Sequence, residues 1–214
     1  MHVVCISASN IKHAGVNSTS YKVCKIICDL VDNDFSKDII KLVDYEFASC
    51  IGCGQCYKED KCYVDDEFNH VYSRICRADA LFIVSAHYAP IPSKLSIVLE
   101  KMEQLAFLKR FNTEAYRSPL FKKPVGLIGH GGGGEEIYKH YKKPVLDSMW
   151  NALSYPIEMN IIGIDEENEK GITFPVKAVK KAEGSIFPIQ EYDWEDIYAR
   201  VKPLVNNVLE CVRP

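Results

Sequence analysis

The chain has 214 residues, 47% of them hydrophobic and 26% charged, and its formal net charge is -3 at pH 7. This length and composition fit one domain, residues 1–214, with a sizeable core, and the slightly acidic balance provides no basic surface for nucleic acid or an anionic membrane. No apolar run is long enough to span a membrane and the start lacks the pattern of a signal peptide, so we expect a cytoplasmic protein without nucleic acid or membrane partners.

The first expected element is a short β-branched strand, His2–Ile6, followed by a polar loop and by apolar residues with helical spacing from Val23 to Val31. This layout favours a phosphate, because the first N–H groups of a helix are unpaired and its dipole attracts anions. Ordinary capping by Ser18 or Ser20 is the alternative, and it accounts for one hydroxyl. Walker A and dinucleotide motifs are absent, which favours a monophosphate such as that of FMN. The candidate ligands are Ser7, Ser9, Asn10, Asn17, Ser18, Thr19 and Ser20.

The second expected strand, Asp38–Val43, leads into a cysteine-rich loop at residues 47–66. Its four cysteines have the spacing C-x2-C-x2-C-x5-C, which places three thiols on one tight turn and a fourth close by, as an iron–sulfur cluster requires. Gly52 and Gly54 allow positive φ between them. Zinc usually takes two separate C-x2-C knuckles, a disulfide framework needs an oxidising compartment, and a cysteine-rich loop without metal also remains open. The candidate ligands are Cys50, Cys53, Cys56 and Cys62. After the loop, Asp65 is expected to cap a helix.

The third expected strand, Ala78–Ala86, is almost continuously hydrophobic, as a central parallel strand covered on both faces would be. His87 and Tyr88 follow it in a loop with two prolines, and a helix opens at Ser93. Such a loop suits contact with a flat ligand. Ordinary surface packing of Tyr88 and a neutral, hydrogen-bonded His87 are the alternatives.

The fourth expected strand, Lys123–Gly129, is followed by His130 and by four glycines, Gly131, Gly132, Gly133 and Gly134. Consecutive glycines suit a backbone that passes close to a bound ring system, and a flexible linker is the alternative. A helix is expected within residues 137–153, with Pro144 marking a break or a new first turn. The fifth strand is expected at Glu158–Ile164, an irregular excursion or extra hairpin at residues 165–190, and a closing helix around residues 197–208.

Alternating strands and helices predict an α/β fold: a flavodoxin-like, doubly wound, five-stranded parallel sheet of order 2-1-3-4-5 with helices on both faces. The loops with ligand-like residues follow strands one, three and four, whose carboxyl ends meet at the switch point of this order. That coincidence favours FMN more than any single motif does.

The four cysteines followed by Val64-Asp65-Asp66 resemble the iron-sulfur flavoproteins, within the flavodoxin-like NADPH-dependent FMN reductases. The resemblance implies a four-iron four-sulfur cluster on the cysteines and FMN at the carboxyl edge of the sheet. It also implies a homodimer or homotetramer in which electrons cross a subunit interface. Residues Ser85, Ala86, His87 and Tyr88 are similar to the family's Ser-Pro-x-Tyr flavin loop, and Gly131 to Gly134 to its glycine-rich third loop. The first loop is similar to the family's phosphate segments but lacks their arginine.

The expected function is an oxidoreductase that passes electrons between FMN and the cluster, with NAD(P)H or a ferredoxin-type protein as donor. Such chemistry needs no acid–base pair, and no catalytic residue is predicted. An NAD(P)H-dependent FMN or quinone reductase without a cluster is one alternative. A non-enzymatic electron carrier is another.

Overall fold

The computed structural model describes residues 1–131, 133–181, 183–184 and 188–213. Its main sheet contains five parallel strands in the order β2-β1-β3-β4-β5, so the predicted fold class and strand order are confirmed. The strands are β1 (His2–Ala8), β2 (Ser36–Lys41), β3 (Ala80–Ala86), β4 (Pro124–His130) and β5 (Asn160–Ile162). The central strands β1, β3 and β4 are buried along almost their whole length, because helices cover both faces of the sheet.

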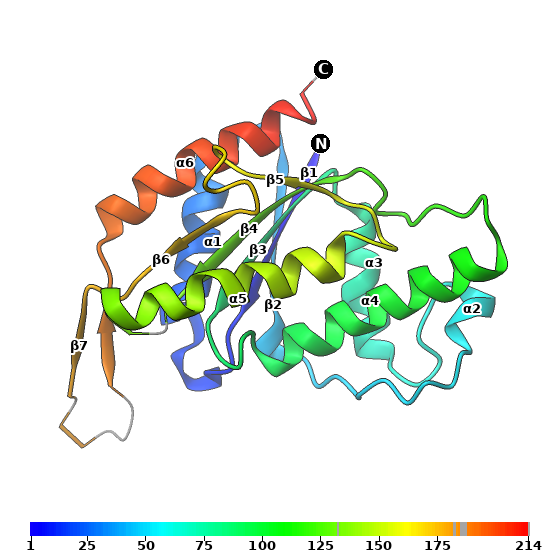
Figure 1. Cartoon of the computed structure of the whole chain (residues 1–214), viewed down its shortest axis with the longest axis horizontal. Coiled ribbons are helices and arrows are strands. Elements are labelled where there is room, and N and C mark those ends of the chain that lie inside the picture. Colours follow the sequence, from blue (N-terminus) through cyan, green and yellow to red (C-terminus); the bar gives the residue numbers. More distant parts are fainter. Residues whose placement is uncertain (132, 182, 185–187, 214) are drawn as a thin grey trace.

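The long helices form two layers (Figure 1). One face of the sheet packs against α1 (Thr19–Leu30) and α6 (Trp194–Glu210), and the other against α3 (Asp66–Arg77), α4 (Ser93–Asn112) and α5 (Glu135–Leu153). Alternate residues of β1 enter the two cores, Val4 and Ile6 on one side and Val3 and Cys5 on the other. The expected break at Pro144 is wrong, since α5 continues through this residue.

Residues 165–190 contribute a strand that the sequence did not suggest. β6 (Ile172–Phe174) pairs in parallel with the carboxyl half of β4, while β5 pairs with its amino half. The last position of the sheet is therefore occupied by two short strands, with residues 163–171 between them. A separate antiparallel pair, β7 (Ala178–Lys180) and β8 (Ile189–Glu191), projects from the body of the molecule (Figure 1).

Three short helices complete the described elements: the 3-10 helices η1 (Lys12–Asn17) and η2 (Leu42–Asp44), and α2 (Cys56–Glu59) within the cysteine-rich loop. None of the helices in the described part of the chain is both long and apolar enough to cross a membrane.

Candidate functional site

Three loops meet at the carboxyl edge of the sheet. The strand register places Ala8 beside Ser85 and Ala86 beside His130. The backbone N–H of His87 donates to the carbonyl of His130 at 2.7 Å, which joins the second and third loops directly. The loops after β1, β3 and β4 therefore surround one region, as parallel strands of this order require.

The hydroxyls of the first loop mostly bind the protein itself. Ser9 Oγ accepts from the N–H of Ile11 at 3.2 Å, and Ser18 Oγ caps α1 by accepting from Tyr21 at 3.3 Å. Ser20 Oγ is buried and donates to the carbonyl of Ala8 at 3.2 Å. Helix capping, the alternative considered for Ser18, is what the structure contains.

The remaining candidates of this loop differ in exposure. Ser7 is buried within β1, Asn10 and Asn17 are exposed, and Thr19 opens α1. Among the described hydrogen bonds, the backbone N–H groups of Thr19 and Ser20 donate to no protein acceptor. These two donors at the positive end of the helix dipole are the ones available to an anion.

His130 connects three segments at the floor of this region. Its Nε2 lies 2.7 Å from Ser20 Oγ and its Nδ1 lies 3.2 Å from the hydroxyl of Tyr192. Ser20 Oγ donates to the carbonyl of Ala8, and the Tyr192 hydroxyl donates to Gln190 Oε1 at 3.1 Å, so the two partners of the ring connect it to the end of β1 and to β8. Burial lowers the pKa of His130 to about 3, so the ring is neutral. It stacks on Phe174 at 5.9 Å. Tyr192 and Phe174 reach His130 from segments beyond β5, and no motif or spacing in the sequence indicates them.

The second loop borders a large pocket. Ser85 Oγ donates to the carbonyl of Ala86 at 3.1 Å, and the His87 ring packs on Tyr141 with 3.6 Å between centroids. Burial lowers the pKa of His87. Tyr88 and Asn10 line a pocket of ≈ 700 Å³ together with residues of α4 and α5, within the size range of small-molecule sites. Two of the predicted cofactor residues thus share one pocket.

The third loop has the backbone that the glycine run predicts. Gly131 has φ +89°, and a Cβ there would lie 3.8 Å from the N–H nitrogen of His87. Gly133 has φ +98°, and Gly134 directly precedes α5. Gly132 lies outside the described residues.

All four predicted metal ligands line one pocket. Cys50, Cys53, Cys56 and Cys62 line a pocket of ≈ 120 Å³ to which α4 also contributes. Gly52 and Gly54 have φ +65° and +68°, in accord with the prediction of positive φ. The pKa of Cys56 is raised by burial and then by the neighbouring thiols of Cys53, Cys62 and Cys50.

This pocket is larger than the space that a single bound ion fills. A single water needs about 10–15 Å³ of such space, and the whole pocket has several times as much. In the described residues no group of three or more His, Cys, Asp or Glu side chains converges as the ligands of one metal ion would. The arrangement therefore differs from a tetrahedral zinc site, in which thiolates lie about 2.3 Å from the ion.

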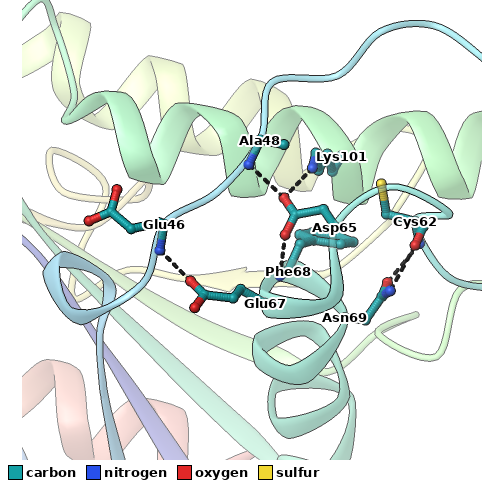
Figure 2. Close-up of polar contacts among 8 residues, drawn as sticks. All are labelled: Glu46, Ala48, Cys62, Asp65, Glu67, Phe68, Asn69 and Lys101. Carbon is teal, nitrogen blue, oxygen red and sulfur yellow. Dashed lines mark hydrogen bonds and ion pairs between the residues drawn. The ribbon is translucent and has the colours of Figure 1, made fainter.

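The base of the cysteine-rich loop is closed by the start of α3 (Figure 2). Asp65 caps α3 by accepting from Phe68 at 2.9 Å, which confirms the predicted cap, and it also accepts from the N–H of Ala48 at 2.9 Å. The side chain of Asn69 binds both the N–H and the carbonyl of Cys62, each at 2.7 Å. The carboxylate of Glu67 accepts from the N–H of Glu46, just before the loop begins. The two ends of the loop are thus tied together by the protein alone.

The two pockets occupy neighbouring stretches of α4. Ser93 to Glu103 contribute to the larger pocket, and Lys101 to Leu108 to the cysteine pocket. From Ser93 to Leu108 the helix rises by about 22 Å. The cysteine-rich loop leaves the carboxyl edge of the sheet, as expected, but is then carried along α4 away from that edge (Figure 1).

The strand order, the helical layers and the loops at the carboxyl edge define a flavodoxin-like protein. The profile of the family described as NADPH-dependent FMN reductase matches residues 1–162, and the chain belongs to this family. The wider family expected from the sequence is thereby confirmed.

Two curated relatives are similar to parts of the chain. An iron-sulfur flavoprotein of Methanosarcina thermophila is 26% identical over 106 residues, 49% of this chain and 53% of that protein. An iron-sulfur flavoprotein of Methanocaldococcus jannaschii is 22% identical over 89 residues, 41% of this chain and 46% of that protein. The matches thus span about half the length of these relatives.

Solved structures share the fold over nearly the whole chain. A flavodoxin of Fusobacterium nucleatum bound to flavin mononucleotide has a TM-score of 0.56 at 10% identity, covering 98% of this chain and 97% of its own. An FMN-dependent NADH-azoreductase of Bacillus anthracis in complex with FMN has a TM-score of 0.52 at 16% identity, covering 100% of both chains. At such identities the likeness concerns the fold alone.

Proposed function

We propose that the chain is an iron-sulfur flavoprotein, an oxidoreductase that passes electrons between FMN and a four-iron four-sulfur cluster. The observation that carries the proposal is the single pocket lined by Cys50, Cys53, Cys56 and Cys62. When bound, FMN would supply two-electron and the cluster one-electron chemistry, so the protein would connect donors and acceptors of different electron number.

The cysteine pocket fits such a cluster in donor chemistry and in size. Four thiols are the ligand set of a four-iron four-sulfur centre, and the pocket that the four cysteines line, ≈ 120 Å³, exceeds the space that one ion needs. Positive φ at Gly52 and Gly54 lets the backbone turn around the centre without a Cβ in the way. The hydrogen bonds from Asp65 and Asn69 hold the loop in this form.

The carboxyl edge of the sheet fits FMN. The free N–H groups at the start of α1 suit its phosphate, and Asn10 and Tyr88 border a pocket large enough for the ring system. The positive φ of Gly131 and Gly133 gives a loop with backbone, rather than side chains, beside a ring placed there. Family membership and the FMN bound in structures of the same fold support this assignment.

We further propose a homodimer or homotetramer, with NAD(P)H or a ferredoxin-type protein as electron donor. Large apolar side chains that line the cysteine pocket lie exposed: Ile51 and Tyr63 are each 69% exposed, and Val64 is 46% exposed. Exposed apolar groups that cluster in this way are typical of surfaces covered by another protein. Their position beside the cysteines suits electron transfer between subunits.

A second candidate is an NAD(P)H-dependent FMN or quinone reductase whose cysteines bind no cluster. The match of residues 1–162 to the NADPH-dependent FMN reductase profile favours it equally, since that description mentions no cluster. A pure electron carrier would bind the same cofactors without oxidising NADH or NADPH faster than free flavin does.

The deciding experiment is purification without oxygen, followed by assays of flavin, iron and acid-labile sulfide and by a visible spectrum. We expect bound FMN with about four irons and four sulfides per chain. Cys53→Ala should abolish cluster absorbance and leave the flavin bound, whereas Cys211→Ala, which removes an exposed thiol outside the loop, should change neither. Flavin without iron in the wild-type protein would leave the second candidate in place.

A further inference from the structure

A buried ion pair lies against the cysteine pocket. Lys101 is 4% exposed and Asp65 is 6% exposed, although lysine and aspartate are rarely buried to this extent. The ammonium of Lys101 binds the carboxylate of Asp65 (Figure 2), and it lies 5.3 Å from the centre of the Phe68 ring. An ion pair of this kind seldom stabilises a fold more than well-packed apolar side chains would, so its presence calls for a reason besides stability.

Of the two partners, Lys101 is the one that lines the cysteine pocket, and Asp65 is not among the lining residues. The two oxygens of Asp65 accept from Ala48, Phe68 and Lys101, so the carboxylate has its donors within the protein.

The ammonium retains donors for the pocket. It has three N–H bonds, and among the described contacts only Asp65 accepts from it. A buried cation with unused donors beside four thiol ligands is placed to bind and neutralise an anionic centre.

We infer that Lys101 is a positioning residue of the cysteine centre that compensates its negative charge and, through Asp65, holds the loop against α4. The inference rests on the proposed function, because the charge to be compensated is that of thiolate ligands around a cluster. A positive charge beside the centre favours its more negative, reduced state, so Lys101 raises the reduction potential.

The test compares the reduction potential of the cluster in loaded wild-type protein and in variants. Lys101→Gln with Asp65→Asn, and Lys101→Met with Asp65→Asn, remove both charges and leave neither partner buried alone, and Asn still caps α3. Lys101→Arg keeps the charge. Lys109→Met is the matched control, because it removes a cation of the same helix whose partner, Asp60, is 53% exposed.

In the uncharged pairs we expect the equilibrium to shift about tenfold toward the oxidised cluster, a fall of about 59 mV for one electron. Lys101→Arg and Lys109→Met should stay within about threefold of wild type. An uncharged pair with full iron and sulfide and a shift below about twofold would overturn the charge assignment, and so would an equal shift in Lys109→Met.

The loop-holding role is measured separately in cluster-free protein. Lys101→Met alone leaves Asp65 without its cation, so amide exchange in residues 46–65 should rise at least tenfold. Lys202→Met, which removes an exposed lysine of α6, should leave it unchanged. Equal exchange in wild type and Lys101→Met would refute this role. Wild-type protein that takes up no iron and sulfide would overturn the proposed function and the charge assignment, while the exchange measurement would still decide whether the pair closes the loop.

Discussion

Asn69 offers the most direct test of how the cysteine-rich loop is built. Its side chain accepts from the N–H of Cys62 and donates to the carbonyl of the same residue, each at 2.7 Å (Figure 2). Both groups are half-buried, and each hydrogen bond should contribute about 1 kcal/mol net. Asn69→Ala should therefore destabilise the closed loop by about 2 kcal/mol, which corresponds to roughly 30-fold in its opening equilibrium.

Amide hydrogen exchange of the cluster-free protein measures this opening. The protection of the Cys62 amide should fall by roughly 10- to 100-fold in Asn69→Ala, while the amides of β1 and β3 should keep theirs. Ser73→Ala is a suitable control, since it removes an exposed hydroxyl of the same helix that binds only the carbonyl of His70. Unchanged protection of Cys62 in Asn69→Ala would refute the view that α3 holds the fourth thiol in place.

Two further predictions concern the sheet and its carboxyl edge. Burial lowers the pKa of His130 to about 3, so the stability it contributes is complete above pH 6.5 and is lost as the pH falls toward 3; down to pH 4.5 the loss is about 3 kcal/mol. In denaturant unfolding, the free energy of unfolding of His130→Gln should therefore fall less between pH 6.5 and pH 4.5 than that of the wild-type protein. An equal fall in both proteins would contradict this. At Gly171, with φ +123°, a Cβ would lie 2.2 Å from the carbonyl oxygen of Leu127, so Gly171→Ala should destabilise by at least about 2 kcal/mol. Gly134→Ser, where a Cβ has open space, should stay within about 0.5 kcal/mol of wild type, and similar losses in both would show that the contact at Leu127 is unimportant.

The strand order could be predicted because the central strands are long and apolar. The run from Leu81 to Val84 is buried on both faces, and this alone identifies a central parallel strand. β6 could not be found in this way, because Ile172–Phe174 has only three residues and owes its burial to pairing with the carboxyl half of β4. Three residues carry too little periodicity to separate a strand from a loop.

The candidate sites differ in how much of them the sequence contains. The cysteine spacing is local, so it predicted four thiols around one space, and the structure brings the four to one pocket. The hydroxyls of the first loop were predicted to be phosphate ligands, but those of Ser9, Ser18 and Ser20 bind nearby backbone or His130. The sequence does not reveal which partner a hydroxyl takes. Lys101 was missed, although a lysine within an apolar helical stripe is itself a signal.

The cysteine-rich loop is added to the fold without being needed by it. It lies between β2 and α3, and the polar contacts described for it come from the first turn of α3 and from Lys101 and Lys109 of α4. The carboxyl edge of the sheet, where FMN is proposed to bind, is here called the flavin edge. It is held together by His130, Ser20 and the backbone of His87, and none of their described hydrogen bonds involves the cysteine-rich loop. Loss of the cysteine centre should therefore leave the flavin edge intact within one chain. Coupling between the two sites then depends on α4, whose neighbouring residues Glu103 and Gln104 border one pocket each, or on a second chain that brings its own flavin edge to the thiols.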